Sequence, residues 1–212
     1  MDDLDAIAER IRQDMTTKTT AREEALRLSR EAIQHCANSI RAVHRGEFDV
    51  AQDRLDQARD RVTRMAQSLQ SFPDIYYAGY VQDAQKEYTE ANAVYALIHG
   101  DPLPSPEDLG VDGAPYLNGL GETVGELRRY ALDRIRRGDV ARAEEVLGWM
   151  QALYEVLVTI DFPNAVTRGL RRTTDVTRSI LERTRGDLTV AVRQEQLERA
   201  LRDFERRVEV GG

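Results

Sequence analysis

Apolar residues recur every three or four positions along almost the whole chain, and this spacing limits the possible folds more than any other feature. It places apolar side chains on one face of an α-helix. No segment shows the two-residue alternation typical of a half-buried strand. Charged residues make up 32% of the chain and aromatic residues 6%, a mixture typical of amphipathic helices. The sequence therefore predicts an all-α bundle of about six or seven helices, in a single domain over residues 1–212.

Glycines, prolines and capping residues divide this pattern into helices. Thr19 or Thr20 is expected to cap the second helix, and Asp139 the sixth. Residues 100–115 hold four of the six prolines and form the one clear loop, which is long for a compact helical domain and suggests a functional role. We expect helices at about residues 2–16, 20–46, 49–69, 73–99, 115–137, 139–160 and 165–208, with a break considered near Gly186.

Charge and cysteine content restrict the class of protein. The formal net charge of −7 argues against a surface that is basic throughout, although 28 of the 30 positive residues are arginines. The single cysteine, Cys36, excludes an internal disulfide framework and fits a reducing compartment. The N-terminal residues are acidic and periodic, unlike a signal peptide. No apolar run approaches the roughly 20 residues of a membrane span. We expect a cytoplasmic protein that does not bind membranes.

Two pairs of glutamates are the candidates for chemistry. Glu87 and Glu90 lie three residues apart in QKEYTEA, and Glu122 and Glu126 lie four apart in YLNGLGETVGEL. These spacings put both carboxylates of a pair on one helical face. Two such pairs on neighbouring helices offer hard oxygen ligands of the kind that Mg²⁺ prefers, with Mn²⁺ as an alternative. Acidic pairs are nevertheless common in a chain with 37 acidic residues, and most such pairs face solvent.

The surroundings of the second pair favour a buried site. Gly119, Gly121 and Gly125 alternate with the apolar residues around the pair. Glycine weakens a helix by about 1 kcal/mol relative to alanine, so three of them require a reason, and a close approach of helices is one. Glutamates near such a packed face carry a cost that a bound cation relieves. No competing site is convincing: three histidines, His35, His44 and His99, have no zinc spacing with Cys36, and no phosphate-binding glycine loop is present.

The sequence resembles the translin/TRAX family in an ordered series of segments. RLSREAIQHCANSIRAVHR (27–45) is similar to the family's second-helix segment. QKEYTEA (85–91) and YLNGLGETVGELRR (116–129) are similar to the two acidic segments of TRAX. WMQALYEVL (149–157) and an arginine-rich C-terminal helix follow in order. The similarity spans most of residues 20–185, and the second acidic segment is its most specific part.

This resemblance implies a translin-like subunit of seven helices, assembly into a hollow homo-octamer, and binding of single-stranded RNA and single-stranded DNA. It also implies Mg²⁺-dependent endoribonuclease activity, because the catalytic, metal-binding acids of TRAX fall on all four glutamates. The third acid is typically aspartate and is Glu122 here. Its longer side chain places the carboxylate further from the helix backbone. Arginines close to the acids or in the second-helix segment are the candidate phosphate contacts. The four acids are Glu87, Glu90, Glu122 and Glu126, and the arginines are Arg129, Arg45 and Arg41.

Three other interpretations remain open. An all-α nucleotide pyrophosphatase of the MazG-like kind also uses an ExxE pair and a second acidic pair on neighbouring helices. The second pair in such enzymes is spaced by three residues, whereas Glu122 and Glu126 are four apart. A translin-type oligomer that binds single-stranded RNA or DNA without cleaving it is the second. A helical scaffold that binds neither metal nor nucleic acid is the third.

Overall fold

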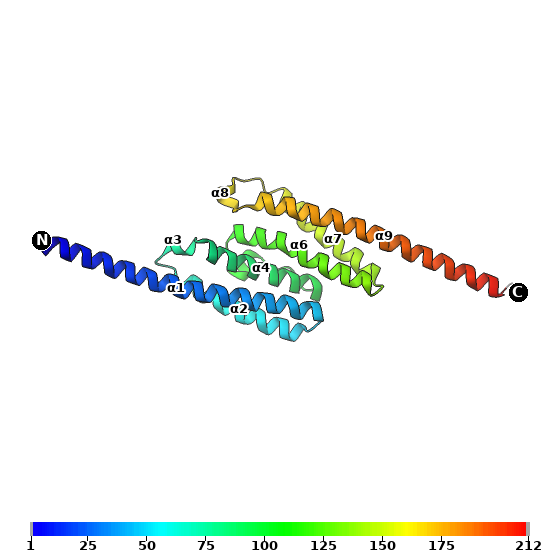
Figure 1. Ribbon diagram of the computed structural model, residues 1–212, viewed down its shortest axis with the longest axis horizontal. Helices are drawn as coiled ribbons and strands as arrows, with labels where there is room; N and C mark the ends of the chain where they lie inside the picture. The colour runs from blue at the N-terminus through cyan, green and yellow to red at the C-terminus, as the bar shows by residue number, and fades with distance from the viewer. Residues whose placement is uncertain (1, 211–212) are drawn as a thin grey trace. The chain divides into compact units, whose positions relative to one another are not determined.

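The computed structural model describes the backbone of residues 2–210 and the side chains of residues 3–208 (Figure 1). Within this range the protein forms nine helices and no strand, which confirms the all-α prediction. Three of the helices, α3, α5 and α8, have only four residues each, so six long helices form the bundle. The helices are α1 Asp2–Arg45, α2 Phe48–Ser68, α3 Pro73–Tyr76, α4 Gly79–His99, α5 Pro106–Leu109, α6 Gly113–Arg136, α7 Val140–Val158, α8 Asn164–Thr167 and α9 Leu170–Val210.

The described chain divides into two compact units, and the boundary falls inside α6. The first unit contains the residues up to Leu120 together with Val166–Arg168. The second contains Gly121–Ala165 and the residues from Gly169 onward. The prediction of one domain over the whole chain remains a prediction.

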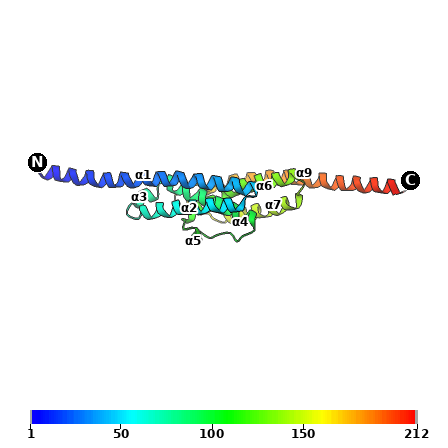
Figure 2. The ribbon, with the colours of Figure 1, turned by 90° about the horizontal axis from the view of Figure 1, so that it is seen from below.

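In the first unit, α1, α2 and α4 run side by side (Figures 1 and 2). The hydroxyl of Ser29 donates a hydrogen bond of 2.8 Å to the carbonyl of Tyr80, and Ser39 donates one of 2.9 Å to Ala51. These bonds satisfy buried polar groups and fix α1 against α4 and α2. Large side chains that are almost completely buried between the three helices include Leu28, Val62, Met65, Leu69 and Tyr88.

In the second unit, α7 packs along α9, and the later turns of α6 join them. Arg128 on α6 contacts two residues of α9: a guanidinium nitrogen donates to the Thr184 hydroxyl at 3.0 Å, and another lies 2.8 Å from a carboxylate oxygen of Asp187. The apolar core of this unit includes Val124, Leu127, Met150, Leu157, Leu170 and Leu181. Beyond the N-terminal end of α7, α9 continues for several turns (Figure 2).

One predicted helix break, before residue 20, was wrong, and the break considered near Gly186 does not occur. Residues 2–45 form one continuous helix. The hydroxyls of Thr16, Thr17 and Thr20 donate to carbonyls four residues earlier, at 2.8 to 3.0 Å, and none of them caps a new helix. Threonine hydroxyls commonly bond in this way inside helices. Gly186 lies within α9, which is not interrupted there.

Other boundaries agree with the sequence in part. The predicted helix over residues 73–99 is divided into α3 and α4 by Tyr77 and Ala78. The proline-rich loop contains α5, whose N-terminus has a capping box between Ser105 and Asp108. Asp139 caps α7 as predicted, since its side chain accepts a hydrogen bond from the backbone of Arg142. Among the described residues, no helix combines the length and apolarity that a membrane span requires.

Candidate metal centre

The first acidic pair lies on α4, which is buried on most of its sides. Glu87 and Glu90 share a helical face, and Tyr88 between them is completely buried. Glu90 itself is only 9% exposed. Removing a carboxylate from water in this way is costly unless a positive charge or hydrogen bonds compensate it. The position of Glu90 inside the bundle therefore distinguishes it from the solvent-facing acidic pairs that are common on helices.

A network of polar side chains fixes the start of α6 against α4. Asp112, directly before α6, accepts a hydrogen bond of 3.1 Å from the Gln82 amide, and its backbone N–H donates to the Gln85 side-chain oxygen at 3.4 Å. The Gln85 amide in turn donates to the Tyr76 hydroxyl at 2.9 Å. Gln82 and Gln85 are both buried in α4. The first turn of α6 is thus held beside α4 through specific contacts.

A glycine allows the two helices to touch a few residues further on. A Cβ atom added at Gly119 would lie 2.6 Å from the backbone oxygen of Lys86 and 2.7 Å from the Cβ of Thr89. Real Cβ atoms do not approach other atoms so closely. Lys86 and Thr89 flank the acidic pair in the sequence. The backbone of α6 therefore meets α4 at the level of Glu87 and Glu90.

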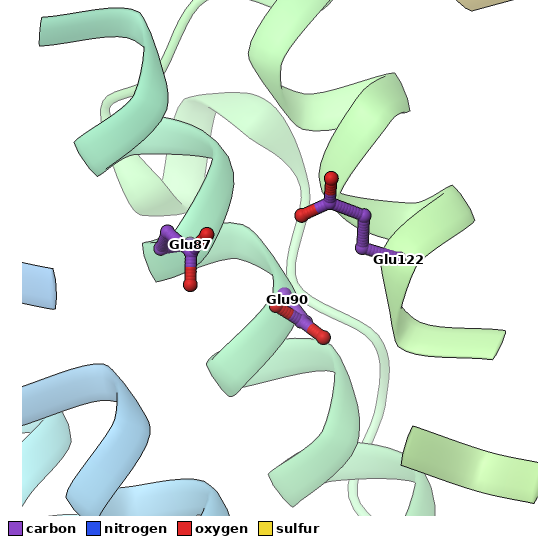
Figure 3. A group of neighbouring side chains, drawn as sticks. All are labelled: Glu87, Glu90 and Glu122. Atoms are coloured by element: carbon purple, nitrogen blue, oxygen red, sulfur yellow. The ribbon is translucent and has the colours of Figure 1, made fainter. Parts of the chain in front are cut away.

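Glu122 follows Gly119 by three residues in the same helix, so both face the same side of α6. One carboxylate oxygen from each of Glu87, Glu90 and Glu122 lies within 4.8 Å of the others (Figure 3). Three of the four predicted ligands are thus brought together, two from α4 and one from α6.

The donor set fits a small hard cation. Mg²⁺ binds oxygens at about 2.1 Å in an octahedron, so its ligand oxygens lie about 3 to 4 Å apart, and it keeps several water ligands. Three carboxylates within 4.8 Å are compatible with such a site after small side-chain movements. Without a cation, three like charges at this separation would repel one another, at a cost that burial increases.

The fourth predicted acid, Glu126, is not a member of this group. It lies one turn beyond Glu122 on α6, and a carboxylate oxygen is 3.6 Å from a guanidinium nitrogen of Arg129. Its part in metal binding or catalysis remains a prediction, and the ion pair places it next to a candidate phosphate contact.

Cys36 of α1 lies behind the acidic pair. Burial raises the pKa of its thiol, and the negative charges of Glu87 and Glu90 raise it further. A thiol with a raised pKa does not supply the thiolate that a cysteine nucleophile requires. The cysteine is therefore a small core residue.

The three predicted phosphate contacts are exposed and paired with nearby polar groups. Arg45 forms two hydrogen bonds, of 2.9 and 2.5 Å, with the carboxylate of Glu47, which raises its pKa. Arg41 donates a 2.7 Å hydrogen bond to the side-chain oxygen of Asn38. Arg129 has the contact with Glu126 described above. Surface pairs of this kind contribute little stability, so phosphate can compete for these arginines.

Two basic residues that contact Glu87 or Tyr88 of α4 were not singled out from the sequence. The ammonium nitrogen of Lys86 lies 3.7 Å from a carboxylate oxygen of Glu87. Arg59 of α2 donates a 3.1 Å hydrogen bond to the hydroxyl of Tyr88. Lys86 is one of only two lysines and adjoins the acidic pair, a signal that could have identified it. Arg59 had no such signal, because its contact depends on how α2 packs against α4.

No family model matches the chain. An uncharacterized protein of Methanocaldococcus jannaschii is 33% identical over 199 residues, which cover 93% of this chain and 86% of that protein. The structure of AfC3PO in complex with duplex RNA is similar with a TM-score of 0.81 and 36% identity, over 87% of this chain and 95% of that one. A crystal structure of AfC3PO is similar with a TM-score of 0.81 and 35% identity, over 87% of this chain and 96% of that one.

The structure of apo-NeC3PO is also similar, with a TM-score of 0.74 over 90% of this chain and 98% of that one. Its identity of 24% shows a shared fold alone. The relationship to AfC3PO is closer and extends over nearly all of that chain. C3PO proteins have the translin fold, and on these grounds this chain belongs to the translin/TRAX family.

Proposed function

We propose that the protein is a Mg²⁺-dependent endoribonuclease that acts on single-stranded RNA. The observation that carries the proposal is the group formed by Glu87, Glu90 and Glu122, whose carboxylate oxygens lie within 4.8 Å of one another. Structural ion pairs would explain isolated acids on a helix surface. Here three carboxylates gather at one place, one of them on a side chain that is 9% exposed, and a small hard cation would neutralise this concentration of charge.

The reaction requires a water oxygen to bond to phosphorus while one P–O ester bond breaks and the leaving oxygen takes up a proton. A bound Mg²⁺ would supply positive charge against the negative charge that develops on the phosphate. The protein side chains would hold the ion, and one carboxylate would accept the proton from water. Glu126 suits that second task, because it adjoins the group and is not a member of it.

Basic side chains near the group would orient the RNA backbone. Lys86 lies within 3.7 Å of Glu87, and Arg129 follows Glu126 by three residues on α6. Arg41 and Arg45, at the end of α1, are further candidates. Phosphate contacts of this kind position a nucleic acid without reading its sequence. We therefore propose that the protein cleaves RNA with little sequence preference. We also propose that it binds single-stranded DNA, which is not needed for cleavage of RNA.

The class of ligand is supported by the relatives. AfC3PO has been solved with duplex RNA, which makes RNA the first ligand to test. Because that RNA is a duplex, the assay must include both strand forms. We further propose that the protein acts as a homo-octamer, in which inward-facing arginines would reconcile RNA binding with a net charge of −7.

The proposal is tested with an end-labelled single-stranded RNA and the same RNA annealed to its complement. Each is incubated with the protein in Mg²⁺ and in EDTA, at one stated salt concentration. The variant Glu90→Gln removes one charge and keeps the side-chain shape. Glu107→Gln makes the same chemical change at an exposed position on α5 and serves as the matched control.

We expect cleavage of the single strand in Mg²⁺ that is lost in EDTA and in Glu90→Gln, and that Glu107→Gln retains. Binding of RNA without cleavage by the wild type would replace the nuclease with a non-catalytic binding protein. Hydrolysis of a nucleoside triphosphate but not of RNA would favour the pyrophosphatase interpretation. Metal-dependent cleavage that survives in Glu90→Gln would remove the three-glutamate group from the mechanism.

A further inference from the structure

Lys86 is exceptional among the basic residues of this chain, because 28 of the 30 are arginines and only Lys18 and Lys86 are lysines. Its ammonium nitrogen lies 3.7 Å from a carboxylate oxygen of Glu87, a member of the three-glutamate group. The two side chains are 23% and 29% exposed, so water and salt screen this pair less than a pair on the open surface. The contact places a positive charge at the edge of the candidate metal centre.

The backbone fixes where this charge lies. Lys86 precedes Glu90 by four residues, so the two side chains share one face of α4. A Cβ atom added at Gly119 would lie 2.6 Å from the backbone oxygen of Lys86, so α4 and α6 touch at this residue. Glu122 follows Gly119 by three residues and faces the same side of α6. Lys86 therefore lies at the level of α4 where the three carboxylates come together.

A count of the charges limits how many cations this group can hold. The three glutamates carry three negative charges when ionised, and Lys86 offsets one of them. One divalent cation would offset the remaining two. Glu126 and Arg129 contact each other at 3.6 Å and offset one another outside the group. A second divalent cation would leave an excess of two positive charges at a partly buried position, which is costly.

The chemistry of an ammonium group suits a position beside a metal ion. A lysine ammonium is a compact, strongly hydrated point charge, whereas an arginine guanidinium is broad and planar. Sites that cleave phosphate esters with two metal ions use the two cations to stabilise the attacking and the leaving oxygen. At a centre with one metal ion, a side chain has to supply the second positive charge. Lys86 adjoins the group closely enough to supply it.

We propose that the centre holds one divalent cation per chain and that the ammonium group of Lys86 takes the place of a second one. Lys86 repels the bound cation, because both are positive, and it provides positive charge to the phosphate of the RNA. It is therefore not a metal ligand, and its role differs from that of a surface ion pair. The inference rests on the proposed metal centre, but metal binding tests it separately from RNA cleavage.

The test compares Lys86→Gln with the wild-type full-length protein. The substitution removes the charge and keeps most of the side-chain length. Binding of Mn²⁺ is measured without RNA by electron paramagnetic resonance, which counts the free ion and so gives both affinity and stoichiometry. Removing a like charge near a divalent cation should tighten binding roughly tenfold. Cleavage of single-stranded RNA at saturating Mn²⁺ should fall in the same variant, whereas the loss of a purely structural residue would weaken both.

Three variants serve as controls. Lys18→Gln makes the same change at an exposed lysine of α1 that pairs with Asp74, and it should leave the affinity for Mn²⁺ unchanged. Lys86→Arg keeps the charge and should bind Mn²⁺ as the wild type does. Lys86→Met repeats the test with an uncharged side chain of similar length, in case Lys86→Gln does not fold. The wild type should bind one Mn²⁺ per chain at a site that Glu90→Gln loses.

Unchanged or weaker binding of Mn²⁺ by Lys86→Gln and Lys86→Met would overturn the proposal. Two ions per wild-type chain that are both lost in Glu90→Gln would do the same, as would tighter binding with undiminished cleavage. A wild type that cleaves no RNA, although Lys86→Gln binds Mn²⁺ more tightly, would remove the nuclease and keep the charge balance of the centre. A wild type that binds no Mn²⁺ would overturn the metal centre and this inference together.

Discussion

The backbone of Gly119 lies so close to Thr89 that a methyl group at Gly119 would come within 2.7 Å of the Thr89 Cβ. This contact joins α6 to α4 one helical turn before Glu122 and between the two acids of the first pair. The geometry of the candidate metal centre therefore depends on a residue that contributes no ligand.

Gly119→Ala is expected to destabilise the protein. Overpacking a tight contact costs about 1–3 kcal/mol, and the better helix propensity of alanine returns up to about 1 kcal/mol. We expect a net loss of about 1–2 kcal/mol in the free energy of unfolding, measured with urea. Gly125→Ala is the control, since a Cβ at that glycine meets nothing within 4 Å, and this variant should be slightly more stable than the wild type. Equal effects at both positions would argue against a close approach at Gly119.

Mg²⁺ is expected to raise the melting temperature of the wild type and not that of Glu90→Gln. A ligand that binds only the folded state at ten times its Kd adds about 1.4 kcal/mol. The substitution removes a ligand charge, and without metal it also relieves repulsion among the three carboxylates, so the variant should be at least as stable in EDTA. Differential scanning calorimetry with and without Mg²⁺ measures both effects. A Mg²⁺ shift of the same size in the two proteins would place the ion elsewhere.

Glu126→Ala is expected to separate metal binding from cleavage. Glu126 lies outside the group of three carboxylates, so the variant should bind Mg²⁺ with an affinity close to that of the wild type. If it accepts the proton of the attacking water, cleavage should fall by about 10²–10⁴-fold, the usual contribution of a general base. Calorimetric titration and single-turnover cleavage provide the two readouts. A large loss of Mg²⁺ affinity would make Glu126 a ligand.

Stability is expected to fall as the pH drops from about 7 to 5, in part because of His35. Burial lowers the pKa of His35, and the positive charges of Arg61 and Arg54 lower it further. Its Nδ1 atom is buried and has no hydrogen-bond partner in the described structure. The unfolded chain therefore takes up the proton first, so stability is lost as the pH falls through the ordinary histidine pKa of about 6.5.

His35→Gln should flatten that part of the curve of unfolding free energy against pH. Carboxylates with lowered pKa values, such as Glu24 and Glu31, titrate below pH 5. The slope of the unfolding free energy against pH in that more acidic range should therefore be the same in the variant and the wild type. A variant whose curve has the same slope as the wild type between pH 7 and 5 would exclude His35 as the cause.

The acidic segments and the helices that carry them could be predicted from the sequence because their signals are local. Glycine, proline and Asp139 indicated helix ends that are present in the structure. The glycines around Glu122 predicted a close approach of another helix to α6. That approach exists at Gly119 and at Gly121, where a Cβ would meet the Thr173 side chain at 2.3 Å, but not at Gly125. Spacing alone did not distinguish the three glycines, since contact depends on which face of α6 each one occupies.

Other features depended on competition between local and tertiary contacts. Thr20 has the chemistry of a helix cap, yet inside a continuous α1 its hydroxyl bonds to the carbonyl of Thr16. The contacts of Lys86 with Glu87 and of Arg59 with Tyr88 follow from side-chain direction and helix packing. Glu126 could not be distinguished from the other three acids in the sequence, because all four share helical spacing.

The candidate metal centre is tested most directly by locating a bound metal ion in a crystal of the full-length protein grown or soaked with Mn²⁺, which replaces Mg²⁺ and has an anomalous signal. We expect an anomalous peak in contact with oxygens of Glu87, Glu90 and Glu122. A protein that binds Mn²⁺ elsewhere, with no peak among these three carboxylates, would contradict it.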